Sequence, residues 1–229
     1  MSLVKKVLFC LGTIFITQSA LAADYSVEIT NLTYKINFTP RIVIAHVPAS
    51  LFTAGDNLND SEGGLLNGQV NNALKEIAES GNLEPMISIL DQESIAPAVS
   101  YVSGEGLLAA GQKQTVNLQG VEGLNKISLF AMMLPTNDGF IALNNKDLPE
   151  TGSVSYLING YDAGTETNTE SCGDIPGPLC GGTALSPDDT GEGFVHIHRG
   201  IRGLGSEIDP AMYDWKNPVA IVTITKTSN

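Results

Sequence analysis

Residues 126–143 read KISLFAMMLPTNDGFIAL, and this stretch decides the fold class. It holds two apolar runs, 126–134 and 140–143, which are separated by the sequence Pro-Thr-Asn-Asp-Gly. Both runs are short enough to be strands, and a break made of Pro, Asn, Asp and Gly is typical of a turn. The stretch therefore predicts two strongly apolar strands joined by a turn.

The rest of the chain repeats this arrangement. Short apolar or alternating segments bounded by turn residues recur, and they predict further strands at 25–33, 41–47, 98–102, 114–118, 153–158, 194–198 and 219–225. One segment differs, because Leu66, Val70 and Leu74 recur at helical spacing before Gly81, which predicts one helix near residues 65–80. Strands that do not alternate with helices predict an all-β fold, an antiparallel β-sandwich with one short helix.

The composition limits the classes of partner. The chain has 229 residues, of which 42% are hydrophobic and 16% are charged, with 24 glycines and a net charge of −13. The apolar content suffices for a core, and the many glycines fit turns better than long solvated helices. Because a strongly negative surface repels phosphates and anionic lipid, we expect no nucleic-acid partner and favour cations as ligands.

The N-terminus has the pattern of a signal peptide. Lys5 and Lys6 precede an apolar run at 7–17, and Ala20-Leu-Ala22 forms a small-residue cleavage site. The run is too short to span a bilayer comfortably. We therefore expect a signal peptide at 1–22, no stable membrane insertion after its cleavage, and a periplasmic or secreted protein with one domain, residues 23–229.

Residues 160–193, the excursion, lack periodicity and are rich in Gly, Asp, Glu and Thr, which predicts a long loop at one end of the sandwich. The excursion contains Cys172 and Cys180, the two cysteines that remain after cleavage of the leader. An oxidising compartment favours a disulfide between them, whereas a metal or redox role needs more thiols or a Cys-x-x-Cys spacing. The excursion also carries acidic residues that we expect to crowd near an ion site: Glu170, Asp174, Asp188, Asp189 and Glu192.

Three carboxylates follow predicted strands, at the end where a sandwich gathers its loops. Asp138 lies in the turn after the first apolar run, and Asp162 and Glu166 follow the strand at 153–158. Hard cations such as Ca²⁺ take six to eight oxygen ligands, which loops supply. Because clustered carboxylates repel one another without a cation, the pattern suggests a site for one Ca²⁺. The alternative is an ordinary turn with solvated loop charges, and the spacing is not that of an EF-hand.

His196 and His198 are two residues apart on a predicted strand, so their side chains project to the same face. With a third ligand such a pair holds Zn²⁺, Cu²⁺ or Fe²⁺, which makes a metalloenzyme or a transition-metal-binding protein the alternative function. His46 is the one other histidine. The competing interpretation is that neighbouring backbone groups satisfy both imidazoles. The sequence lacks motifs for a catalytic nucleophile or a phosphate-binding loop, so we expect no catalytic activity.

Four runs together resemble the spondin N-terminal domain family. They are SLFAMMLPTNDGF at 128–140, YDAGTE at 161–166, GFVHIHRGI at 193–201 and WKNPVA at 215–220. The resemblance covers nearly all of the chain after the leader. It implies a β-sandwich related to C2 domains, with a calcium site at one end whose ligand positions correspond to Asp138, Asp162 and Glu166.

Glu166 departs from the family pattern, because animal members carry Asp there and the extra methylene moves the carboxylate outward. The resemblance implies an exported calcium-binding module without catalytic activity. We therefore expect an adhesion or surface-interaction domain whose partner is a protein or glycan of a cell surface or matrix.

Overall fold

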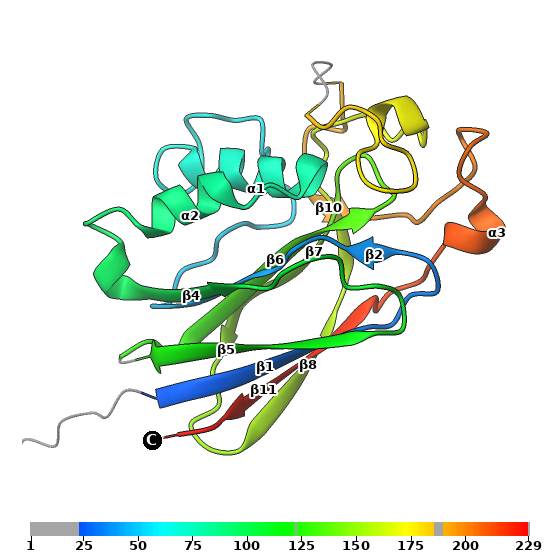
Figure 1. Cartoon of the computed structure of the whole chain (residues 1–229). Coiled ribbons are helices and arrows are strands. Elements are labelled where there is room, and N and C mark those ends of the chain that lie inside the picture. Colours follow the sequence, from blue (N-terminus) through cyan, green and yellow to red (C-terminus); the bar gives the residue numbers. More distant parts are fainter. Residues whose placement is uncertain (1–22, 122, 186–189, 229) are drawn as a thin grey trace, which may run out of the picture.

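Two antiparallel β-sheets pack face to face in this protein, which confirms the predicted all-β sandwich (Figure 1). The computed structural model describes residues 23–121, 123–185 and 190–228. The predicted signal peptide, residues 1–22, lies outside the described residues. The likeness to C2 domains stays a prediction.

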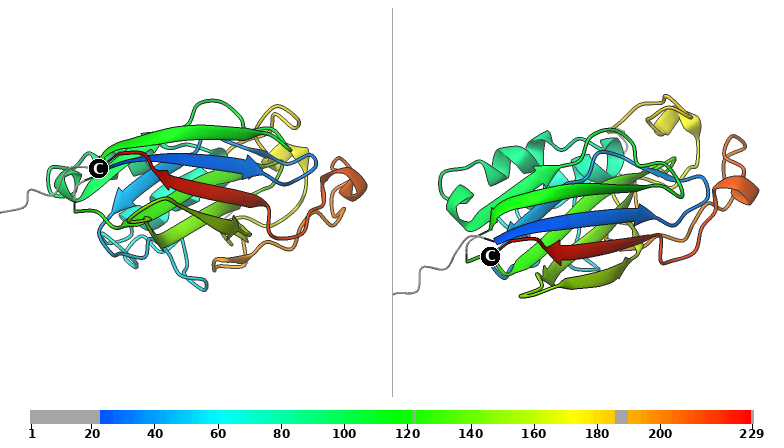
Figure 2. Two further views of the ribbon diagram at one scale, coloured as in Figure 1. Left: turned by 90° about the horizontal axis from the view of Figure 1, so that it is seen from below. Right: turned by 60° about the horizontal axis from the view of Figure 1, so that its bottom comes forward.

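The first sheet has four strands in the order β5-β1-β11-β8. The first and last strands of the described chain pair with each other, from Tyr25 opposite Lys226 to Asn31 opposite Ala220. Residues along β1 alternate between buried and partly exposed, because the outer face of this sheet carries no helix (Figure 2). The strand bounds are β1 (Ala23–Asn31), β5 (Lys113–Val121), β8 (Ser153–Ile158) and β11 (Ala220–Lys226).

The second sheet runs in the order β10-β9-β7-β6-β3-β4, and the short strand β2 also pairs with β6. Every strand pair in the described residues is antiparallel. The predicted strand at 194–198 contracts to the two residues of β10. The bounds are β2 (Asn37–Phe38), β3 (Ile42–His46), β4 (Val99–Ser103), β6 (Lys126–Leu134), β7 (Gly139–Asp147), β9 (Gly160–Asp162) and β10 (His196–Ile197).

Strand β6 is buried on both faces, which explains its continuous apolar sequence. Leu129, Ala131 and Met133 point into the core between the two sheets. Phe130 and Phe140 lie instead in a second core, between this sheet and the helices that cover its outer face (Figure 1). A strand covered on both sides cannot alternate between apolar and polar residues, so its sequence shows an unbroken apolar run.

Helices α1 (Gln69–Ser80) and α2 (Glu84–Leu90) form that covering layer. Helix α1 corresponds to the predicted helix, although it begins at Gln69, whereas α2 is an addition that the sequence did not predict. Its buried residues Met86, Ile89 and Leu90 span too few positions for a helical period to be recognised. The remaining helical turns are α3 (Pro210–Tyr213), η1 (Ala96–Ala98) and η2 (Cys172–Asp174). Within the described ranges, no helix has the length and apolar character needed to cross a membrane.

Arg41, immediately before β3, ties the two sheets together. Its fully buried guanidinium donates to the carbonyl oxygens of Thr39, Glu105 and Gly106 at 2.8–3.1 Å, and to the side chain of Gln114 on β5. Burial lowers the pKa of Arg41 to about 10, so the group remains charged at neutral pH. This buried cation therefore links the start of β3 in the second sheet to Gln114 in the first sheet and to the neighbouring loop carbonyls.

We predict that Arg41→Lys destabilises the protein by about 3 kcal/mol, because an ammonium cannot reproduce the planar fork of donors yet stays buried. Urea denaturation followed by circular dichroism measures the change. The matched control is Arg199→Lys, the same substitution at an exposed position, which should change stability by less than about 0.5 kcal/mol. Equal stability of the two variants would contradict the role of Arg41.

Candidate metal centre

The candidate centre lies where β9 pairs with strands on both sides. Asp162, the last residue of β9, lies opposite Gly139 on β7 and opposite His196 on β10. The turn after β9 requires Gly164, whose φ is 66° and where an added Cβ would lie 2.3 Å from the carbonyl oxygen of Phe194. Strand register therefore brings the end of β9, the turn before β7 and the histidine strand to one place.

Asp162, Glu192 and His196 form a group that could hold a metal ion. Each offers one ligand atom, and these atoms all lie within 4.8 Å of one another. Asn168 connects the two carboxylates, since its Nδ2 donates to Asp162 Oδ2 at 2.8 Å and lies 3.4 Å from Glu192 Oε1. Asp162 is buried, His196 is partly buried and Glu192 is exposed. The group thus joins two strand ends to the excursion.

The hydrogen bonds of His196 leave one ring nitrogen prepared to bind a metal. Its Nδ1 lies 2.9 Å from the carbonyl oxygen of Ile197, which accepts only, so Nδ1 carries the proton. In the neutral ring Nε2 then presents a lone pair. This atom is buried, makes no hydrogen bond within the described residues, and lies 3.6 Å from Asp162 Oδ1. A lone pair facing a carboxylate oxygen is favourable only when a cation or proton lies between them.

His198 has the opposite tautomer. The backbone N–H of Gly200 donates to its Nδ1 at 3.0 Å, so in the neutral ring the proton resides on Nε2. That nitrogen faces Asp162 Oδ2 at 3.9 Å. Like His196 Nε2, this nitrogen is buried and makes no hydrogen bond in the described residues, but in this tautomer it carries a proton instead of a lone pair. The two histidines project toward the same aspartate but are suited to different roles.

Asp138 and Glu166 lie beside this group. Asp138 Oδ2 accepts hydrogen bonds from the backbone N–H groups of Thr165 at 2.8 Å and Glu166 at 3.1 Å. Asp138 Oδ1 is buried and has no hydrogen-bond partner in the described part of the chain. The side chain of Glu166 is also buried. Asp138 is thus held against the segment that follows Asp162. Within the described residues, however, the carboxylate oxygens of Asp138, Asp162 and Glu166 do not all lie within 4.8 Å of one another.

Burial of like charges makes this end of the sandwich electrostatically unfavourable. Burial raises the pKa of Asp138 well above its usual value, and the nearby charge of Asp162 raises it further. Burial also raises the pKa of Asp162, against the hydrogen bond from Asn168. The pKa of His198 is lowered to about 4, mainly by burial. A bound cation offsets the cost of ionised carboxylates in such a place.

A cavity of about 190 Å³ opens onto the group. Asp162, Glu192 and His196 line it, together with Arg199 and Arg202. The group therefore borders this cavity, with Glu192 exposed and His196 Nε2 buried.

His46 does not join the other two histidines. It lies at the far end of β3, opposite Lys126 at the start of β6, whereas the candidate centre lies beyond the end of β6. Its Nδ1 lies 2.6 Å from the carbonyl oxygen of Val47, and its Nε2 lies 2.9 Å from Ser128 Oγ. Both nitrogens are satisfied, so His46 is a structural histidine.

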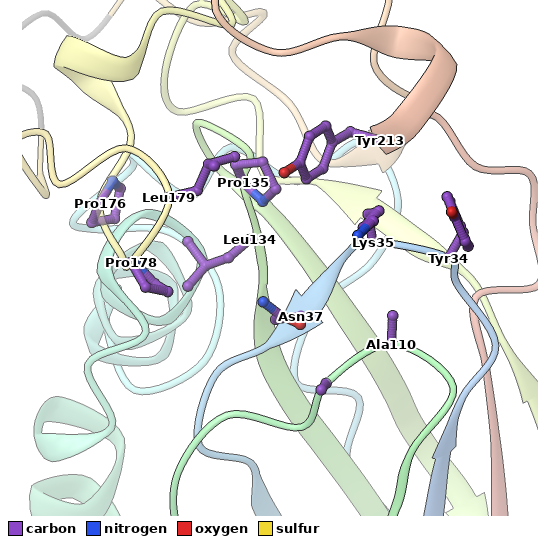
Figure 3. A pocket seen from close by; sticks show the side chains of 11 residues that line it. Tyr34, Lys35, Asn37, Ala110, Leu134, Pro135, Pro176, Pro178, Leu179 and Tyr213 are labelled. Carbon is purple, nitrogen blue, oxygen red and sulfur yellow. The ribbon is translucent and has the colours of Figure 1, made fainter.

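A larger cavity, of about 460 Å³, lies between the β2 segment, the end of β6 and the loop closed by the cysteines (Figure 3). Its lining includes Tyr34, Tyr213, Pro176 and Pro178, and Lys35 is the one charged residue among the described residues that line it. It lacks the clustered carboxylates and imidazoles that metal binding needs. The candidate centre is therefore the smaller cavity.

The predicted disulfide is confirmed, since Cys172 and Cys180 are bonded and close a loop with a sequence separation of 8. A second anchor is Glu170, whose buried carboxylate accepts from the backbone N–H groups of Arg202 at 2.7 Å and Leu204 at 2.8 Å. The excursion is thus hydrogen-bonded to the 202–204 segment, and the disulfide closes a loop within it. Glu192 is positioned separately by its neighbours, since Thr167 Oγ1 donates to the Thr190 carbonyl at 2.8 Å and the Gly193 N–H donates to the Gly164 carbonyl at 2.8 Å.

The sequence placed Glu192 among the acidic residues near an ion site but did not single it out as a candidate ligand, and it treated the carboxylates and histidines as separate sites. Asp162 and His196 are 34 positions apart, and only the β9–β10 pairing brings them together. A signal was nevertheless present, because Glu192 lies four residues before His196 in an acidic loop. Asp188 and Asp189 lie outside the described residues.

A scan against protein-family models found no matching family, and a search of curated proteins found no match.

We predict that replacing both cysteines, Cys172→Ser with Cys180→Ser, lowers the free energy of unfolding by about 2–3 kcal/mol, the chain-entropy value for a loop of this length. Urea denaturation with and without reductant measures the loss. Reductant should destabilise the wild type and leave the double variant unchanged. If full reduction leaves the free energy of unfolding of the wild type unchanged, the disulfide does not contribute to stability.

Proposed function

We propose that this protein binds one divalent cation of the zinc class, with Asp162, Glu192 and His196 as its ligands. The observation that carries the proposal is the lone pair of His196 Nε2, which faces Asp162 Oδ1 at 3.6 Å without a hydrogen bond in the described residues. Its Nδ1–H is held by the Ile197 carbonyl, the arrangement by which proteins orient metal-binding imidazoles.

The donor set favours zinc over calcium at this position. Imidazole suits Zn²⁺, Cu²⁺, Fe²⁺ and Ni²⁺, whereas Ca²⁺ takes oxygen ligands almost entirely. One nitrogen and two carboxylates occupy three positions of a tetrahedral ion and leave the fourth open. Within this proposal His198 and Asn168 serve as supports that orient Asp162.

The ion acts on structure rather than on chemistry in this proposal. By joining Glu192 to Asp162 and His196, it ties the end of the excursion to β9 and β10. The ordered loops, with one open coordination position, then present a surface to a protein or glycan partner. The resemblance to spondin domains, the disulfide and the signal-peptide pattern support an exported, non-catalytic interaction module that works in the periplasm or outside the cell.

Calcium remains the second candidate, with Asp138, Asp162 and Glu166 as ligands. The observation that favours it is the buried Asp138 Oδ1, which lacks a hydrogen-bond partner among the described residues. Both candidates use Asp162, so an Asp162 variant cannot separate them. Asp138 and His196 each belong to one candidate only, and they therefore discriminate between the two.

We predict that untagged protein purified without chelator contains about one equivalent of zinc or a related transition metal, measured by elemental analysis. His196→Gln should weaken zinc binding at least a hundredfold in isothermal titration, because it removes the one nitrogen ligand. At a free zinc concentration of about a hundred times Kd, the wild type should gain about 2.7 kcal/mol of stability, and EDTA should reverse the gain.

The matched control is His198→Gln, which we expect to keep zinc binding within about a hundredfold of wild type, the usual range for a supporting residue. Asp138→Asn should leave zinc affinity unchanged. If calcium stabilises the wild type, and Asp138→Asn abolishes that effect while His196→Gln does not, the calcium candidate replaces the zinc proposal. Melting that is insensitive to EDTA and to every added ion excludes both.

A further inference from the structure

An apolar cavity of about 290 Å³ lies between the helical layer and the β3–β4 edge of the second sheet, away from the candidate metal centre. Ile44 on β3 and Val99 on β4 form its floor, and Val70 on α1 with Met86 and Ile89 on α2 form its wall. Apart from His46 and Ser94, every described residue that lines it is apolar. Small-molecule sites in proteins have this composition, a mostly apolar cavity with a few polar groups.

The interior offers no polar group to a ligand. Both ring nitrogens of His46 are engaged, by the Val47 carbonyl and by Ser128 Oγ. Ser94 is exposed and therefore lies at the rim. Because a buried polar group needs a partner, the part of a ligand inside this cavity must be hydrocarbon. A cavity of about 150 Å³ accommodates benzene, so this one has room for roughly ten to twelve carbon atoms.

The mouth is open and conformationally unusual. Val47, Leu65 and Leu66 line the cavity yet remain 44%, 38% and 41% exposed. Leu66 and the following Asn67 have φ values of 55° and 52°, a left-handed conformation that side chains rarely adopt. Strained residues of this kind cluster at ligand clamps. Leu65 and Leu66 thus lie at the entrance and remain partly in solvent.

Acidic residues predominate in the segments that supply the mouth. The segments 47–66 and 83–99, which supply the mouth and much of the wall, contain six acidic residues and no Lys or Arg: Asp56, Asp60, Glu62, Glu84, Asp91 and Glu93. Two lysines near the cavity are paired with carboxylates: Lys75 on α1 lies 3.9 Å from Glu79, and Lys126, which is opposite His46, lies 2.6 Å from Asp147. Such a rim repels an anionic head group and attracts a cationic one.

We propose that this cavity binds the hydrocarbon tail, about ten carbons long, of a small amphiphile with a positively charged head group. The tail fills the space beneath α1 and α2, and the head lies at the acidic mouth. The inference is independent of the metal centre, since the two sites share no residue.

Decyltrimethylammonium, used below its micelle concentration, is the probe, and decanoate supplies the same tail with the opposite charge. Methyl NMR of the purified protein should show saturable shifts at Val70, Met86 and Ile89, and none at Val27 and Ile29 between the sheets. Decyltrimethylammonium should bind at least fivefold more tightly than decanoate at low ionic strength, and salt should reduce the difference.

Ala98→Phe places a ring in the cavity from a partly exposed position and should weaken decyltrimethylammonium binding at least tenfold. The matched control, Ala110→Phe, makes the same change outside the cavity and should bind like wild type. Ala49→Phe replaces Ala98→Phe if that variant does not fold.

Three results would overturn the proposal. They are shifts that do not saturate, equal binding by the Ala98→Phe variant, and decanoate binding as tight as that of the cationic probe. A stable dimer in sedimentation with Leu65 and Leu66 buried between copies would also overturn it.

Discussion

The pairing of the three-residue strand β9 with β7 on one side and β10 on the other determines the geometry of the candidate metal centre. That pairing places Asp162 opposite both Gly139 and His196, and every other member of the candidate centre follows from it. Asp138 precedes Gly139 directly, and Glu192 precedes the β10 strand by a few residues. If the register shifted by one residue, His196 and Asp162 would point to opposite faces of the sheet. A small number of backbone hydrogen bonds therefore sets the geometry of the whole site.

The second sheet keeps two kinds of chemistry apart. Carboxylates and imidazoles lie together at the β9–β10 end of this sheet. The apolar cavity lies at the β3–β4 edge, beneath α1 and α2. Strand β6 separates the two cores, because Leu129 and Met133 face the other sheet while Phe130 faces the helices. The carboxylate and imidazole group and the apolar cavity thus lie at different places on the same sheet.

The fold class was predictable from local sequence, and the site was predictable only in part. Apolar strands such as 126–134 and the turn at Asp138 are local features, so the sandwich could be inferred. Helix α2 was missed because seven residues show too little periodicity. The carboxylates and histidines were recognised individually. They come close to one another around Asp162 only because β9 pairs with β10, and these two strands are far apart in sequence. The different tautomers of His196 and His198 depend on the Ile197 carbonyl and the Gly200 amide, which no spacing rule reveals.

The pairing of β1 with β11 has a consequence for the order in which the molecule assembles. Tyr25 pairs with Lys226 across almost the whole described chain, and β1 is flanked on its other edge by β5. The four-stranded sheet therefore cannot form completely until β11 has been synthesised. Until then, the edge of β1 that pairs with β11 has no partner strand. Long-range closure of this kind slows folding.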